Sequence, residues 1–148
     1  MIECIYLQTP SIAYDRLVHM TEEIELSDRS QLPRTVYHVV PERVFVACTN
    51  AAGDYDGRFQ DWSKNAPYLH TTTDLDTLKR RVSGNWQSSP LSEVFLLLTI
   101  QTDHIIPPPR VTYADYNGVR YFHLWSALPA ASFTSSVIRR ESDGSFDV

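Results

Sequence analysis

The chain has 148 residues, of which 43% are hydrophobic and 21% are charged, a composition that predicts one globular domain with a hydrophobic core. A net charge of −5 argues against binding to nucleic acid or to an anionic membrane, because both require a basic surface. No apolar run is long enough to span a membrane, and the N-terminus lacks the features of a secretion signal. We therefore expect a cytoplasmic protein, as a monomer or homodimer, with Cys4 and Cys48 as buried free thiols.

The first 33 residues are predicted to form a short strand and a helix. Apolar and other residues alternate from Ile2 to Leu7, which is typical of a strand. Thr9 and Pro10 then form a helix start, with threonine as the cap and proline at the first helical position. Apolar residues follow at helical spacing: Ala13, Leu17, Met20 and Ile24. Glu22, Glu23 and Glu25 oppose the helix dipole at its end, and residues 27–33 are predicted to be a linker.

The next segment is predicted to contain a strand, a helix and a loop. Residues 35–40 are mostly β-branched or aromatic, and Pro41 ends this strand, which carries His38. From Pro41 the apolar spacing predicts a helix, although residues 44–46 alone also suit a strand. Residues 53–59 combine glycine, aspartate and aromatic residues, the composition of a packed loop.

The sequence from residue 68 to residue 84 predicts a strand followed directly by a helix. The strand carries His70 into three threonines, of which Thr73 is placed to cap the helix. Acidic residues stand at the start of the helix, basic residues near its end, and Gly84 is the expected stop. The buried stripe is expected to be Leu75, Leu78 and Val82.

The C-terminal part is predicted to be mainly strands. Residues 94–100 are apolar at nearly every position, so we expect a buried strand at the centre of the sheet. Asn117 and Gly118 predict a tight hairpin turn between an extended segment from Val111 and a strand over residues 119–125 that carries His123. Residues 133–140 are expected to form the last strand, followed by a turn at residues 143–144.

Three histidines in strands, His38, His70 and His123, are the candidate catalytic residues. Histidine suits acid or base catalysis because its pKa lies near neutrality. Alternatively, each is a buried neutral ring bonded to a backbone carbonyl. We expect no metal site, because no two histidines have the close spacing of zinc ligands, and no nucleophile motif is present.

Aromatic residues near the three histidines are candidates for the walls of a substrate pocket, or alternatively are parts of the core. Thr72, near a helix N-terminus, is a candidate for contact with an anionic group, or only caps the helix. The predicted substrate-binding residues are Tyr37, Tyr55, Phe59, Trp62, Tyr68, Thr72, Tyr121 and Trp125.

Several short segments, in order and spacing, resemble the family numbered 952 among the domains of unknown function. The matching segments cover residues 34–148 and leave residues 1–33 as an extension; they are residues 36–39, 52–55, 68–72, 95–100, 121–129 and 143–146. The resemblance implies an α+β fold similar to ADP-ribosyltransferases, with a split sheet around a cleft that holds NAD in those enzymes. His38 then matches the histidine that holds the nicotinamide ribose, whereas only Asp115 lies near the position of the transferase glutamate.

Three functions remain open on the sequence. The first is a small cofactor-independent enzyme that cyclises, isomerises or hydrolyses an apolar organic molecule in a biosynthetic pathway, through His38, His70 and His123. The aromatic surroundings and the missing glutamate favour it. The second is an ADP-ribosyltransferase-like or NAD-hydrolysing enzyme, on fold analogy alone. The third is a non-catalytic domain that binds a small ligand.

Overall fold

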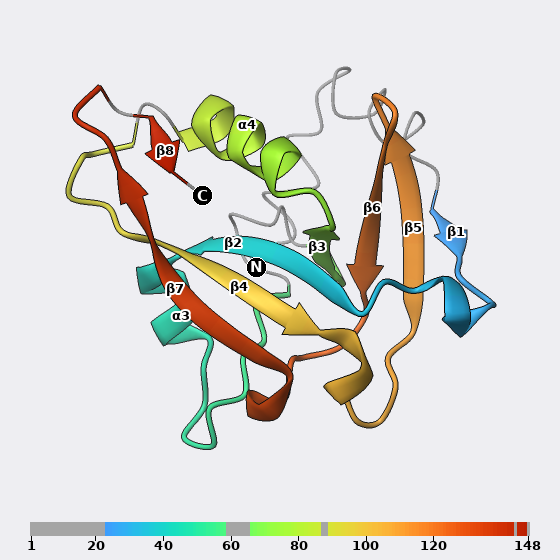
Figure 1. The fold of residues 1–148 in the computed structure, drawn as a ribbon. Helices are drawn as coiled ribbons and strands as arrows, with labels where there is room; N and C mark the ends of the chain where they lie inside the picture. The colour runs from blue at the N-terminus through green and yellow to red at the C-terminus, as the bar shows by residue number, and fades with distance from the viewer. Residues whose placement is uncertain (1–22, 59–65, 87–88, 144, 148) are drawn as a thin grey trace, which may run out of the picture.

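An antiparallel sheet of eight strands forms the frame of the molecule (Figure 1). A computed structural model describes residues 23–58, 66–86, 89–143 and 145–147. The strand order is β1-β5-β6-β3-β2-β4-β7-β8. The strands are β1 (Ile24–Glu25), β2 (Thr35–Pro41), β3 (Leu69–Thr72), β4 (Phe95–Gln101), β5 (Val111–Tyr116), β6 (Val119–Leu124), β7 (Phe133–Arg140) and β8 (Phe146–Asp147). In this part of the chain the α-helices are α3 (Glu42–Ala47) and α4 (Leu75–Trp86), which confirms the α+β class.

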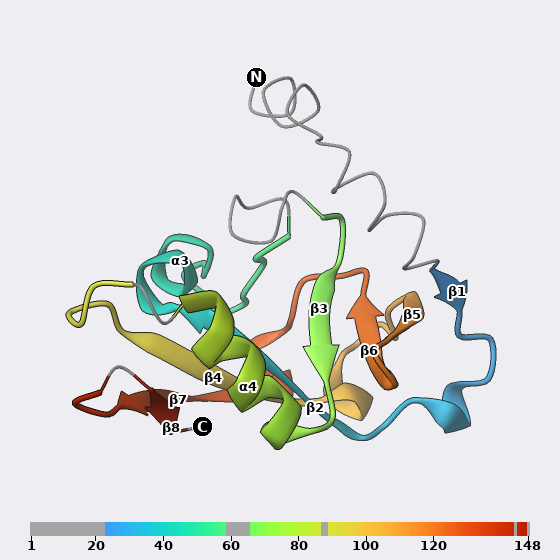
Figure 2. The same cartoon turned by 90° about the horizontal axis from the view of Figure 1, so that it is seen from above.

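The sheet divides between β2 and β3. Strand β2 pairs with β4 along its whole length, from Thr35 opposite Gln101 to Pro41 opposite Phe95. Its register with β3 is limited to Tyr37 opposite Thr72. Figure 1 shows the consequence: the antiparallel strands β2, β4 and β7 lie along one axis, whereas the antiparallel strands β3, β6 and β5 lie across it. Figure 2 places β1 at one edge of the sheet, beside β5, and β7 with β8 at the other.

Each face of the sheet packs against one of the two helices. One core cluster includes Val36, Val40 and Tyr55, and Phe45 of α3 packs against it. The second cluster includes Val39 of β2 together with Leu78 and Val82 of α4, with Leu75 at its border. The stripe predicted for this helix is therefore confirmed. Successive residues of β2 contribute to opposite clusters, as the pleat of a strand requires.

Strand β4 confirms the prediction of a buried sheet strand at residues 94–100. It lies between β2 and β7, and Phe95, Leu96, Leu98 and Ile100 are buried. Leu97 of this strand is only half-buried. The strand β7 partner opposite Leu97 is Ser136, an exposed residue, so the cover on that face is incomplete there.

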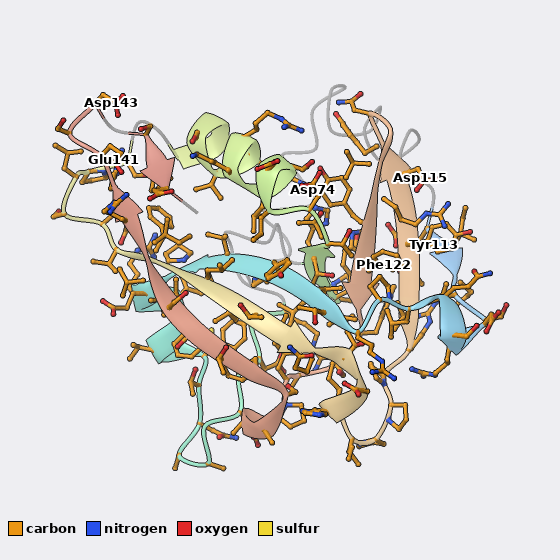
Figure 3. All side chains as sticks on the ribbon, in the orientation of Figure 1. Asp74, Tyr113, Asp115, Phe122, Glu141 and Asp143 are labelled. Atoms are coloured by element: carbon orange, nitrogen blue, oxygen red, sulfur yellow. The ribbon has the colours of Figure 1, made fainter. Side chains whose placement is uncertain are left out.

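Helix α4 begins and ends differently from the prediction. Asp74, labelled at the start of the helix in Figure 3, precedes it and accepts a hydrogen bond from the Asp76 backbone at 2.9 Å. Its other carboxylate oxygen accepts from the Thr77 hydroxyl at 2.9 Å. The cap is therefore Asp74 instead of Thr73, since a carboxylate also suits the positive end of the helix dipole. The helix continues past the expected stop at Gly84 to Trp86.

The N-terminal prediction is wrong at Ile24, which lies in strand β1 opposite Tyr113 and not in a helix. Pairing with the edge of β5 outweighs the helical spacing of the apolar residues here. The predicted linker at residues 27–33 contains a short 3-10 helix, Arg29–Gln31, started by Asp28. The predicted strand at residues 2–7 and the helix start at Thr9 lie outside the described residues. None of the helices in the described ranges is long and apolar enough to cross a membrane.

The hairpin between β5 and β6 confirms the turn predicted at Asn117 and Gly118. Both residues have positive φ, 52° and 77°, as the tight turn that suits twisted strands requires. The β6 strand ends at Leu124, one residue before the predicted end. Strand β7 has the predicted bounds.

Gly57 is a position where the fold requires the absence of a side chain. A Cβ atom on Gly57 would collide with the hydroxyl and ring of Tyr55, a side chain that is fully buried. We expect Gly57→Ala to lower the free energy of unfolding by about 1–3 kcal/mol, the usual cost of overpacking. Gly84→Ala is the matched control, because a Cβ there meets nothing within 4 Å and alanine favours a helix. Urea unfolding of both variants measures the difference, and equal stability of the two would contradict the expectation.

Candidate functional site

Two of the predicted histidines, His70 and His123, lie directly opposite each other on β3 and β6. Opposed residues of antiparallel strands project from the same face, so the two rings meet. The Nδ1 atom of His70 is 2.7 Å from the Nε2 atom of His123, a hydrogen bond between the two imidazoles.

The pair of imidazoles continues at both ends into a hydrogen-bonded chain. The Nδ1 atom of His123 is 2.7 Å from Oε1 of Glu23, which precedes β1. The Nε2 atom of His70 is 2.6 Å from Nη1 of Arg81 on α4. The Thr112 hydroxyl, on β5, also donates to Oε1 of Glu23 at 2.6 Å. We call the residues Glu23, His123, His70 and Arg81 the histidine chain.

The two ends of the histidine chain determine where its protons lie. The Arg81 guanidinium only donates hydrogen bonds, so the Nε2 atom of His70 must accept and its Nδ1 atom must carry the hydrogen. That hydrogen is donated to Nε2 of His123, whose Nδ1–H is donated in turn to the Glu23 carboxylate. Each N–H of the chain then points from the Arg81 end towards Glu23, and both histidines are neutral. Such a chain can move a proton from His70 towards Glu23 without moving a heavy atom.

The surroundings of the histidine chain favour this protonation state. Burial lowers the pKa of His70 well below its ordinary value, and the nearby positive charge of Arg81 lowers it further. Burial alone would raise the pKa of Glu23, but the hydrogen bonds from His123 and Thr112 outweigh it, so the pKa is lowered. Glu23 is therefore an anion at neutral pH, and its side chain remains 27% exposed. Because Glu23 is partly exposed, a proton that reaches this end of the histidine chain can pass to solvent.

Aromatic rings enclose the two histidines. The Tyr68 ring stacks on His123 with ring centres 4.0 Å apart, and Tyr121 stacks on His70 at 4.5 Å. Trp125 lies beside Tyr68, and its indole N–H donates to the Thr112 hydroxyl at 2.9 Å. Tyr68, Tyr121 and Trp125, three of the candidate pocket residues, thus lie beside the histidine chain. They fix the ring planes of the histidines and supply an apolar environment.

His38, the third candidate catalytic residue, does not share this site, so the grouping of the three histidines is wrong for His38. Tyr37 lies opposite Thr72, so Tyr37 projects from the same face as His70, and the adjacent His38 projects from the other. The His38 ring lies 6.4 Å from Tyr55, in the opposite core, and its Nδ1–H donates to the backbone carbonyl of His70 at 2.7 Å. Burial lowers the pKa of His38 to about 4, although that hydrogen bond opposes the change.

Neither His70 nor His123 has a free ring nitrogen in this structure. Both nitrogens of His70 and both of His123 are hydrogen-bonded within the histidine chain. Any reaction at His70 therefore requires Arg81 to release the Nε2 atom. The partners are side chains and not the backbone carbonyls of the alternative interpretation, so they can be exchanged for a ligand.

The remaining predicted substrate-binding residues are not gathered at the histidine chain. Tyr55 is fully buried in the core on the His38 face. Tyr37 packs at the border of the α4 cluster, and the Thr72 hydroxyl accepts from the Asp74 backbone at 3.3 Å. Thr72 therefore supports the start of α4. Phe59 and Trp62 lie outside the described residues.

Glu23 and Arg81 are the site residues that the sequence analysis missed. Both were interpreted only through their effect on a helix dipole. Glu23 belongs to a segment expected to be helical, and Arg81 stands among three consecutive basic residues that a helix end favours. The alternation of Glu23 and Glu25 around Ile24 was the available signal for a strand, and it predicts that both carboxylates project from one face.

No group of three or more histidine, cysteine, aspartate and glutamate side chains in the described ranges is arranged to hold a metal ion. Cys48 is a free thiol and is half-buried instead of buried as expected. Burial raises the pKa of its thiol, and the negative charge of Asp56 raises it further, so it is a weak nucleophile.

Comparison with known proteins gives a structural likeness only. No family model matches the sequence, and no curated protein matches it. The fold is similar to the crystal structure of protein CC0527 from Caulobacter crescentus, with a TM-score of 0.57 and 16% sequence identity over 76% of this chain and 93% of that chain. A double mutant of the same Caulobacter crescentus protein matches equally well, with the same identity, coverage and TM-score. At this identity the likeness shows a shared fold and nothing about activity.

Proposed function

We propose that this protein is a cofactor-independent enzyme that removes a proton from a small, largely apolar organic molecule, with His70 as the general base. The continuous bond path from Glu23 through His123 to His70 carries the proposal, because a carboxylate that holds an imidazole in one tautomer is a common support for a base. The stacked rings of Tyr68 and Tyr121 suit an apolar substrate. Isomerisations and cyclisations that pass through an enolate or carbanion begin with such a proton transfer, and in a hydrolysis the same base would take the proton from water.

The proton balance of this step follows from the bond directions. The Nε2 atom of His70 takes the substrate proton, and the bonding electron pair stays on the substrate. His70 passes its Nδ1 hydrogen to Nε2 of His123, which passes its own Nδ1 hydrogen to Glu23. The carboxylic acid formed at Glu23 can lose its proton to solvent at the exposed side of that residue. His123 and Glu23 are positioning residues here, since they act through His70.

The finer fold assignment is also a proposal. The division of the sheet between β2 and β3 supports a split-sheet fold similar to ADP-ribosyltransferases, and it agrees with the resemblance to family 952. Use of NAD is less well supported. Asp115, near the position of the transferase glutamate, is exposed on β5 (Figure 3) and accepts two hydrogen bonds from Arg120. A carboxylate bound in this way is poorly placed to direct a transfer reaction.

Deuterium exchange tests the proposed base. Carbon acids, some neutral and some carrying a carboxylate, are incubated with the protein in D₂O, and proton NMR detects loss of the acidic hydrogen. We expect at least one compound to exchange, and His123→Ala to slow that exchange by about 10²-fold or more. His104→Ala is the control, because His104 is exposed and lies outside the histidine chain. A wild-type protein that exchanges none of the compounds but binds one would indicate the non-catalytic ligand-binding domain instead.

A further inference from the structure

Arg81 is held against a neutral base instead of a counter-ion. Arg81 is a half-buried residue whose guanidinium donates to Nε2 of His70 at 2.6 Å and lies over the Tyr121 ring, 5.0 Å from the ring centre. No carboxylate among the residues that the structure describes forms an ion pair with it. Arginines elsewhere on the molecule do have such partners, for example Arg58 with Asp56 and Arg120 with Asp115.

This contact blocks the atom that the proposed reaction needs. The Nε2 lone pair of His70 is occupied by an Arg81 N–H, and a cation at this distance also opposes protonation of the ring. In the free protein His70 therefore cannot act as a base. The block is reversible, because Arg81 keeps part of its surface in solvent and its long side chain can turn away on α4.

An anion is the ligand that would draw Arg81 from His70. A guanidinium binds a carboxylate through two parallel charge-assisted hydrogen bonds, which are stronger than one bond to a neutral nitrogen. A single cation balances one negative charge, so a carboxylate fits better than a doubly charged phosphate in a partly buried place. The aromatic surface of Tyr121 lies beside this position and suits an apolar group attached to the carboxylate.

We propose that the substrate is an aromatic or other unsaturated carboxylic acid whose carboxylate binds Arg81 and thereby frees the Nε2 atom of His70. This inference rests on the proposed function, since it names the substrate class of the same site. It assigns Arg81 two roles: in the free protein it blocks the base, and in the complex it recognises the substrate. Neutral compounds of the same shape leave the block in place.

Benzoate is a suitable probe for the binding step, with benzamide as its neutral counterpart and inorganic phosphate as an anion without an apolar group. Protein labelled with ¹⁵N in its histidines is titrated at pH 7 with each compound. We expect saturable binding of benzoate that shifts the Nε2 signal of His70, and at least tenfold weaker binding of benzamide and of phosphate. Benzoate that binds without changing His70, or no saturable binding of benzoate at all, overturns the inference.

The neighbouring arginine provides a matched control. Arg81→Gln should weaken benzoate binding at least tenfold, whereas Arg80→Gln, which removes the same charge one residue earlier from an exposed side chain, should not. Arg81→Lys keeps the charge but not the paired donors, and it serves as the second variant if the glutamine variant does not fold. Equal losses in the Arg80 and Arg81 variants would mean a general charge effect and would overturn the inference.

The outcomes of the two proposals are separable. If benzoate binds through Arg81 but exchange activity survives in His70→Ala, the anion site stands and the proposed base does not. If neutral carbon acids exchange through His70 and Arg81→Gln leaves their rate unchanged or raises it while benzoate does not bind, the base stands and the substrate class is wrong.

Discussion

Acidification from pH 7 to pH 5 should destabilise the folded protein steeply, because His38 and His70 stay neutral in the fold and become protonated when the chain unfolds. Burial lowers the pKa of His38 to about 4 and that of His70 well below 6.5. The unfolded chain therefore binds both protons more readily. As a result, the free energy of unfolding reaches its full value only above pH 6.5. Each histidine then contributes a loss of up to about 1.4 kcal/mol per pH unit. For His38 the loss ends near pH 4, where the folded form also becomes protonated.

Urea unfolding at pH 8, 7, 6 and 5 measures this dependence. Below pH 6.5 the slope of the free energy of unfolding against pH reports the number of protons taken up on unfolding. In His38→Asn this number should be lower by about one, because asparagine does not titrate. His104→Asn is the control, since that side chain is exposed. Glu23 does not contribute in this range, because its pKa is lowered from an ordinary value of 4.5 and its stabilising effect is lost only at lower pH. An unchanged slope in His38→Asn would contradict the neutral buried state of that residue.

The parts of the fold that were predicted correctly have strong local signals. The turn at Asn117 and Gly118 requires positive φ at both positions, which few residue pairs allow. Strand β7 and the buried stripe of α4 follow from composition and spacing within one element. Ile24 shows the opposite case: its environment is determined by Tyr113 of β5, and this long-range pairing outweighs the local helical spacing.

The candidate site was predicted only in part, because its contacts join distant parts of the chain. His70 and His123 are 53 residues apart, and Glu23 and His123 are 100 residues apart. Local spacing shows which residues of one strand share a face, but not which face of one strand matches which face of the next. A one-residue difference in register moves a side chain to the other side of the sheet. This is why His38 was placed with the other two histidines, although Tyr37 is the residue on their face.

Replacement of His70 by alanine should abolish proton exchange while leaving the protein folded. Loss of a general base lowers a rate by about 10²–10⁴-fold. The cost in stability should be only about 1–3 kcal/mol, because the change leaves Nε2 of His123 and one N–H of Arg81 without their partner but opens little of the core. Circular dichroism and urea unfolding at pH 8 measure the stability, and deuterium exchange measures the activity.

Asparagine at position 70 separates the chemical role of His70 from its structural role. Its amide can replace one hydrogen bond of the imidazole, so binding of a small ligand can be retained. It cannot accept and pass on a proton near pH 7, so exchange should stay as low as in His70→Ala. Activity restored by asparagine would mean that His70 only positions its neighbours. Full activity in the alanine variant would remove His70 from the reaction, and the base would then have to be sought outside the histidine chain.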